Sequence, residues 1–116
     1  MPAKKLRLEP NEIKPLSRNR GGCLATDRIT VQGEKVGYMY RQHHPDSKFP
    51  DSGWTFLAGT ESQEYLDDPS NTEIYDVNTI ANYDPDIIPF LDAPFGSAFA
   101  RDPRTGKFSK TEGPPE

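Results

Sequence analysis

Apolar residues in this chain occur in short segments, and turn-forming residues soon follow each segment. Residues 36–41 (VGYMYR) alternate with a period of two, so every second side chain lies on the same face of a strand. Residues 23–26 (CLAT) and 54–58 (WTFLA) are apolar runs of strand length. Short apolar or alternating segments that are separated by turn-forming residues predict several short strands.

The first half of the chain predicts a hairpin. Residues 29–31 (ITV) alternate as a strand would, and residues 32–35 (QGEK) form a turn in which Gly33 can adopt a positive φ at no steric cost. Residues 43–52 are rich in Pro, Asp, Ser and Lys, which predicts a loop. Further strands are predicted at residues 72–77, 98–100 and 107–108, with a turn over 102–106 between the last two.

Short helical turns are predicted between the later strands. A helix over residues 61–67 must end before Asp68-Pro69, because a residue before proline disfavours the α region. Asp76 or Asn78 is placed to cap a helical turn that runs to Tyr83. Asp84 followed by Pro85 joins an N-cap acid to a proline at the first helical position, and Pro89 makes the turn over residues 85–91 short and 3₁₀-like.

These elements predict an α+β fold. We expect one small domain with a mainly antiparallel, twisted sheet and short helices or 3₁₀ turns. Its length, 116 residues, suits a single domain. Residues 1–20 contain three prolines and no steady hydrophobic period, which predicts a flexible basic N-terminal arm. Residues 21–108 form the predicted domain, and residues 109–116 form a predicted disordered tail.

The formal net charge of −4 conceals an uneven distribution. Residues 1–20 carry a net charge of +4, whereas residues 21–101 carry −8. From residue 49 to residue 100 there are ten acidic residues and no Lys or Arg. An acidic surface without compensating cations attracts basic proteins and repels nucleic acid, so we expect a protein partner and no nucleic acid.

Several function classes lack their sequence signatures. The single cysteine, Cys23, excludes an internal disulfide and sits in an apolar run, which favours an inert buried thiol. His43 and His44 are adjacent in a loop and do not have the spacing of metal ligands. No Gly-rich phosphate loop and no Gly-x-Ser-x-Gly motif occurs. We therefore expect no cofactor, no metal and no catalytic residues.

The chain also lacks an apolar run long enough to span a membrane and a signal-peptide pattern after Met1. A cytoplasmic protein without membrane contact is the expectation.

Four sequence blocks together resemble a bacterial family. They are residues 22–30 (GCLATDRIT), 35–41 (KVGYMYR), 51–56 (DSGWTF) with 64–68 (EYLDD), and 74–92 (IYDVNTIANYDPDIIPFLD). The last block continues into residues 96–102 (GSAFARD). The family was long filed as a domain of unknown function and is grouped with the immunity proteins of polymorphic toxin systems, as the type thirty-three immunity domain. The resemblance covers about residues 22–108, and it implies a small α+β domain with no established enzymatic activity.

Three hypotheses of function follow. The first is a non-catalytic, cytosolic protein that neutralises a toxin domain, expected to be basic, through an acidic surface. The second is a regulatory or housekeeping interaction module without a toxin, which an orphan gene locus would favour. The third is an acid-pair hydrolase, which requires a pocket where two carboxylates face each other. The first hypothesis predicts that acids and aromatic residues bind the partner: Tyr65, Asp67, Asp68, Tyr83, Asp84 and Asp86.

Overall fold

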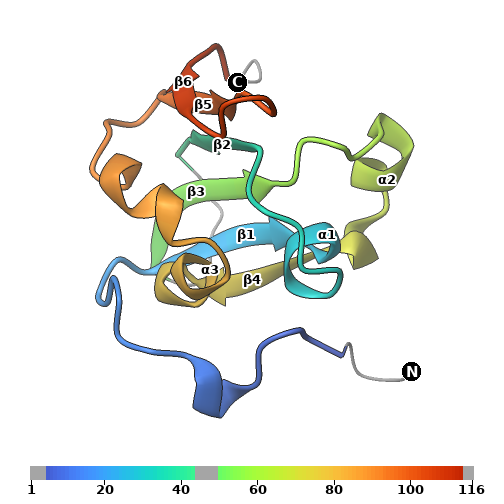
Figure 1. Ribbon diagram of the computed structural model, residues 1–116, viewed down its shortest axis with the longest axis vertical. Coiled ribbons are helices and arrows are strands. Elements are labelled where there is room, and N and C mark those ends of the chain that lie inside the picture. The colour runs from blue at the N-terminus through green and yellow to red at the C-terminus, as the bar shows by residue number, and fades with distance from the viewer. Residues whose placement is uncertain (1–4, 44–49, 114–116) are drawn as a thin grey trace.

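The computed structural model describes residues 5–43 and 50–113. In chain order the elements are η1 (Pro10–Glu12), β1 (Gly22–Thr26), α1 (Asp27–Thr30), β2 (Tyr38–Arg41), β3 (Asp51–Leu57), α2 (Gln63–Asp67), η2 (Pro69–Asn71), β4 (Thr72–Asp76), α3 (Val77–Tyr83), η3 (Pro85–Phe90), β5 (Ala98–Arg101) and β6 (Phe108–Lys110). The strands of this described part form one sheet in the order β4-β1-β3-β2-β5-β6 (Figure 1). All neighbouring strands are antiparallel except β1 and β3, which are parallel. The predicted α+β fold with a mainly antiparallel sheet is confirmed.

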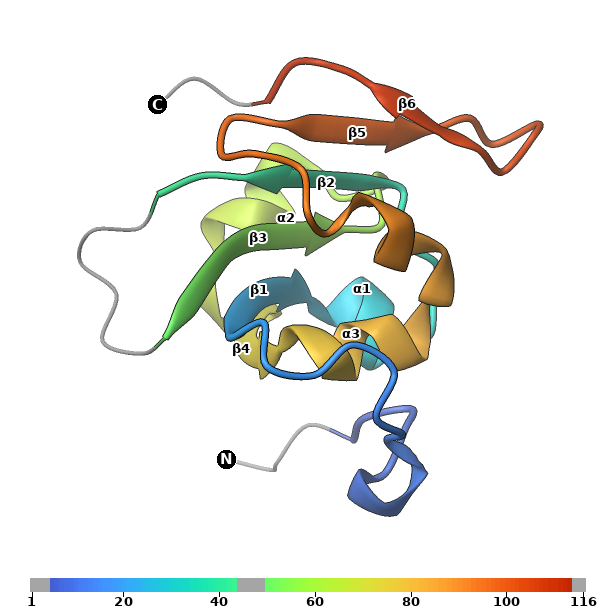
Figure 2. The same ribbon diagram turned by 90° about the vertical axis from the view of Figure 1, so that its left-hand side faces the viewer.

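The sheet has one strongly buried face. Register places Ala25, Phe56, Met39 and Phe99 in one row across four strands, and none of them is more than 6% exposed. Trp54, two residues before Phe56 on β3 and so on the same face, joins this core. Figure 2 shows α3 and the orange η3 segment on the same side of the sheet. Burying these apolar side chains is the main favourable contribution to folding.

The helices contribute apolar side chains to that face. Ile80 of α3 and Ile87 of η3 are fully buried in the core. Ile29 of α1 and Val36, which lies between α1 and β2, are buried in the same cluster. One face of the sheet and a layer of short helices therefore enclose a single core.

The predicted hairpin over residues 29–41 is wrong. Asp27–Thr30 forms α1 instead of a strand, and β2 pairs with β3 and β5. A helical turn lets Ile29 enter the core completely, while the C=O of Ile29 accepts a hydrogen bond from Gly33 N–H at 3.0 Å. Tertiary packing here overrides the strand preference of β-branched residues. The turn at Gly33 is present, with a φ of 79°.

The other predicted helices and their caps are confirmed. Helix α2 ends at Asp67, before Asp68-Pro69. Asp76 caps α3 by accepting a hydrogen bond from Asn78 N–H, and Asp84 caps η3 through Asp86 N–H. The segment η3 is a 3₁₀ helix that contains Pro89. Local sequence signals therefore determine these helix starts.

The chain between residues 5 and 20 lies against α3 and α1. Asn78 Oδ1 accepts hydrogen bonds from Leu16 N–H and Ser17 N–H, both at 2.8 Å. Asn82 Oδ1 accepts another from Lys14 N–H at 2.9 Å. These contacts lie inside the predicted N-terminal arm, whose flexibility stays a prediction.

Two other predicted segments lie partly outside the described residues. Residues 44–49 of the predicted loop over residues 43–52 lie outside the described residues. The last two positions of this predicted loop, Asp51 and Ser52, belong to β3. At the C-terminal end, β6 runs to Lys110 and Thr111 N–H donates to Ala98 O at 3.0 Å. The predicted tail therefore begins with paired residues, and residues 114–116 lie outside the description. In the described ranges, no helix has the length and hydropathy needed to cross a bilayer.

Candidate binding surfaces

The six residues predicted to bind a partner divide into two groups. Tyr65, Asp67 and Asp68 lie on α2 and directly after it, and the other three lie on α3, η3 and the junction between them. Figure 1 shows α2 on the right of the sheet and the orange η3 segment on the left. The six residues therefore lie on two separate parts of the fold, and their role in binding stays a prediction.

The group at α2 presents exposed carboxylates. Asp67 is exposed and accepts a hydrogen bond from Gln63 Nε2 at 2.9 Å. Asp68 is also exposed and accepts from Ser70 N–H at 3.0 Å, as the cap of η2. Tyr65 is half-buried, and the guanidinium of Arg28 lies 4.9 Å from its ring centroid. Burial raises the pKa of the Tyr65 hydroxyl, so this side chain is neutral in the physiological range.

The group at η3 is mostly structural. Asp84 is fully buried; Val36 N–H donates to its Oδ2 at 2.9 Å, and Arg101 Nη2 lies 3.0 Å from the same oxygen. Tyr83 donates its hydroxyl proton to Thr30 O at 3.0 Å, inside the fold. Only Asp86 offers an exposed side chain, at 66%. Asp84 is therefore not accessible to a partner in this structure, because the fold itself uses its carboxylate.

Glu61 is a further acid with a structural position that sequence reasoning did not single out. Its carboxylate accepts hydrogen bonds from Thr26 Oγ1 at 2.5 Å, Ala58 N–H at 2.8 Å and Gly59 N–H at 2.8 Å. Burial alone would raise the pKa of Glu61, but these hydrogen bonds outweigh it and hold the pKa below its ordinary value. Glu61 thus joins the end of β1 to the chain that leaves β3.

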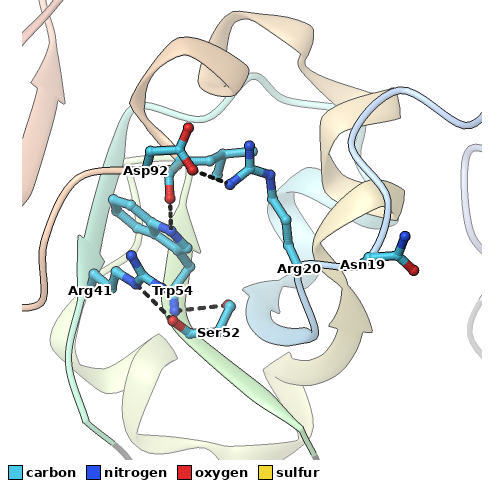
Figure 3. Close-up of a pocket in the computed structure, with 7 residues that line it drawn as sticks. Asn19, Arg20, Arg41, Ser52, Trp54 and Asp92 are labelled. Atoms are coloured by element: carbon cyan, nitrogen blue, oxygen red, sulfur yellow. Dashed lines mark hydrogen bonds and ion pairs between the residues drawn. The ribbon is translucent and has the colours of Figure 1, made fainter.

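A pocket of about 280 Å³ opens between β3, β2 and the segments next to them (Figure 3). Arg41 donates from Nε to Ser52 O at 2.8 Å, and Trp54 donates from Nε1 to Leu91 O at 3.2 Å. Arg20 Nη1 and Asp92 Oδ1 form an ion pair at 2.7 Å across the pocket. The hydrogen bond and charge of Arg20 lower the pKa of Asp92. These residues are distant in sequence, so no local motif could have revealed the pocket.

The pocket does not provide the arrangement that an acid-pair hydrolase needs. Asp92 is the single carboxylate among its described lining residues, and it is paired with Arg20. Glycoside hydrolysis uses two carboxylates that flank the substrate bond.

Metal and thiol chemistry find little support in the described residues. Within them, no three His, Cys, Asp or Glu side chains gather as a metal site would require. Cys23 is fully buried, and burial raises the pKa of its thiol strongly. A thiol of this kind is a poor nucleophile. His43 is exposed and stacks on Phe95 at 4.0 Å, while His44 lies outside the described residues.

One exposed feature was missed by sequence reasoning. Strand β4 lies at an edge of the sheet, and the side chain of Ile74 at its centre is 56% exposed. The sequence predicted a strand here but contained no signal for its place in the sheet. Such a place depends on pairing between β4 and β1, which are about fifty residues apart.

Comparisons with known proteins give one match. No curated protein and no solved structure matches the chain. A family model, described as the immunity protein Imm33 domain, matches residues 23–112.

Proposed function

Because the chain belongs to the Imm33 immunity-protein family, we propose that it binds a toxin domain and neutralises it without catalysis. The observation that carries the proposal is the family match, which extends over residues 23–112 and so covers β2 to β6 completely and all of β1 except its first residue. The family description indicates a toxin-neutralising role in general. The charge of the toxin domain and the surface that it contacts are proposed below.

The distribution of charge supports a basic toxin domain as the partner. Residues 49–100 contain ten acidic residues and no Lys or Arg. Of these acids, Asp84 is buried, whereas Glu64, Asp67, Asp68 and Asp86 are exposed. Exposed carboxylates of one sign raise the association rate with a cationic partner and add less to the final affinity.

The site of action that we propose is the cytoplasm, where a toxin would have to be blocked after synthesis or entry. Binding alone suffices for this role, since a protein that covers an active site needs no reaction of its own. The described pocket, with its single carboxylate paired to Arg20, is consistent with that interpretation.

Co-expression tests the proposal directly. Each toxin domain encoded beside this gene is expressed in a sensitive bacterial strain, with and without the 116-residue chain. We expect one of them to stop growth alone, to permit growth with the chain, and to co-purify with it. If no toxin domain is neutralised and none forms a complex, the proposed function is wrong.

A matched pair of variants tests the role of the acidic surface. The double variant Glu64→Gln/Asp67→Asn removes two exposed charges at α2, and Glu12→Gln/Glu112→Gln removes two exposed charges outside residues 49–100. We expect the first pair to lower the association rate with the captured toxin by about threefold to tenfold at low salt. The control pair should change it by less than about twofold. Equal effects of both pairs would contradict a localised acidic surface.

A further inference from the structure

Among the described residues, the outer side of β4 has no strand partner for its backbone groups. Val77 N–H donates to Gly21 O at 3.0 Å, and the register continues with Cys23 opposite Tyr75 and Leu24 opposite Ile74. Hydrogen-bonded pairs alternate with non-hydrogen-bonded pairs in an antiparallel ladder. Tyr75 therefore bonds to β1, while the N–H and C=O of Ile74 point away from it. Within the described residues, no strand pairs with this outer side.

The neighbouring residues extend this open edge. Thr72 N–H donates to Pro69 O, so Thr72 turns only its C=O outward. Asp76 lies in a non-hydrogen-bonded pair with Gly22, so its N–H also points outward. The edge thus offers Thr72 C=O, both polar groups of Ile74 and Asp76 N–H, which can pair with a short strand.

The two edges of the sheet differ in protection. Strand β6, at the far edge, has three residues and ends with Lys110, and Lys107 precedes it. Short length and lysine side chains are common devices that prevent a foreign strand from pairing with an edge. Strand β4 has five residues, no lysine and a 56% exposed isoleucine at its centre. It therefore lacks the devices that shield β6.

The acidic side chains around β4 favour a basic segment as the strand that pairs with its outer side. Asp67 and Asp68 precede the strand, and Glu73 and Asp76 belong to it; all four side chains are exposed. Residues 49–100, which include this strand and α2, contain no Lys or Arg. An incoming strand with Lys or Arg side chains would meet opposite charge along its length.

We propose that β4 is the docking edge for the partner, and that a basic extended segment of the toxin domain adds to the sheet as a seventh strand beside Ile74. This inference rests on the proposed function and specifies the contact. Main-chain hydrogen bonds to Ile74 supply register, and an apolar partner side chain covers the exposed isoleucine. The pairing uses only the edge and needs no change in the core.

Proline substitution tests the edge without disturbing the ladder to β1. Ile74→Pro removes the outward N–H and fills its place with a ring, and proline is tolerated on an edge where the N–H faces solvent. Ile74→Ala keeps the N–H and trims the side chain. Lys110→Pro is the matched control: Thr111 N–H bonds to Ala98 O, so the alternating ladder turns Lys110 N–H outward on β6. The probe is the toxin domain captured by co-expression, and its affinity for each variant is measured by titration calorimetry.

We expect Ile74→Pro to weaken binding by at least about tenfold, Ile74→Ala by less, and Lys110→Pro by less than about twofold. Hydrogen exchange provides a second measurement that needs no variant: the Ile74 amide should exchange rapidly in the free protein and slowly in the complex. Wild-type affinity in Ile74→Pro, or an unprotected Ile74 amide in the complex, would overturn the docking edge and leave the proposed function standing. If the wild-type chain binds no toxin domain, the proposed function itself fails. A concentration-dependent dimer that Ile74→Pro abolishes would assign the edge to a second copy of this chain and overturn the proposal.

Discussion

The carboxylate of Asp84 accepts hydrogen bonds from Val36 N–H and Asp86 N–H, while Arg101 Nη2 lies 3.0 Å from Oδ2. Three separate parts of the chain thus meet at one fully buried side chain. An ionised group in the interior is tolerated only when its charge is paired and its lone pairs are satisfied. Here both conditions are met, so Asp84 fixes the start of η3 against the end of β5.

Replacing Asp84 should strongly destabilise the fold. We expect Asp84→Ala to lower the free energy of unfolding by about 3–5 kcal/mol, because it removes one partner of a buried ion pair and a helix cap together. Urea unfolding followed by circular dichroism measures the change. Asp86→Ala is the matched control, since its carboxylate is 66% exposed and lies 3.4 Å from the same guanidinium. The control should lose less than about 1 kcal/mol, and equal losses would refute the structural role of Asp84.

The sequence predicted half of this site. Aspartate followed by proline indicates an N-cap, because both residues suit the first turn of a helix. Nothing local shows that Arg101, seventeen positions later, lies beside the same carboxylate. Burial is decided by packing between distant elements, so the sequence alone could not show that the fold itself uses the Asp84 carboxylate.

At the scale of elements, Glu61 joins the ends of the two parallel strands, β1 and β3. The carboxyl ends of neighbouring parallel strands lie at the same end of a sheet. The backbone groups that follow the last hydrogen bonds between the two strands need other partners. The Glu61 carboxylate accepts hydrogen bonds from Thr26 at the end of β1 and from Ala58 and Gly59 just after β3. One side chain therefore satisfies donors from both strand ends.

The pH dependence of stability should reveal this role. Because the folded-state pKa of Glu61 is lowered, its contribution to stability is fully present above the ordinary value of 4.5 and is lost as the pH falls through the lower folded-state pKa. Glu61→Gln should therefore be less stable than the wild type by about 1–2 kcal/mol at pH 7, and solvent at this half-buried site keeps the difference modest. Unfolding curves from pH 7 to pH 3 should show the two proteins converging. A constant difference across this range would contradict the assigned role.

Elements with strong local signals were predicted well, and those with weak signals were not. The caps at Asp76 and Asp84 have a chemistry that acts within three residues, so α3 and η3 begin where expected. Helix α1 has four residues, two of them β-branched, and the side chain of its N-cap, Thr26, donates to Glu61 instead of capping. Its helical form depends on burying Ile29, which no short-range pattern reports.

At the scale of the whole molecule, residues 5–20 run along α3 and α1. Asn78 Nδ2 and Asn82 Nδ2 both donate to Lys14 O, at 2.9 Å and 2.8 Å. Further along, Leu8 N–H donates to Tyr83 Oη at 3.0 Å. The prolines and the missing hydrophobic period of this segment do not distinguish a segment that is bound to α3 from a mobile one. The hydrogen bonds join backbone groups of the segment to side chains of α3, and neither property of the sequence reports such bonds.

Hydrogen exchange can separate these two interpretations. We expect the amides of Lys14, Leu16 and Ser17 to exchange at least about tenfold more slowly in the wild type than in Asn78→Ala. The Asn78 side chain accepts the hydrogen bonds of the Leu16 and Ser17 amides, and its Nδ2 holds Lys14 through the carbonyl oxygen of that residue. Asn11→Ala, a change on an exposed residue of the arm, should leave their exchange unchanged. Rapid exchange of all three amides in the wild type would show that the segment is mobile.

The strand order has a consequence for how the chain folds. Strand β1 is made early but pairs with β3 and β4, so its first neighbour is complete only after about half of the chain exists, and its second only after about two thirds. Loop-closure entropy must be overcome before such distant pairs contribute, and folds dominated by them form in milliseconds to seconds rather than microseconds. A nascent chain on the ribosome therefore holds β1 unpaired until β3 emerges, and paired on one side only until β4 emerges. We therefore expect the chain to become able to bind a partner only when the whole sheet has formed, and not when a single strand has been synthesised.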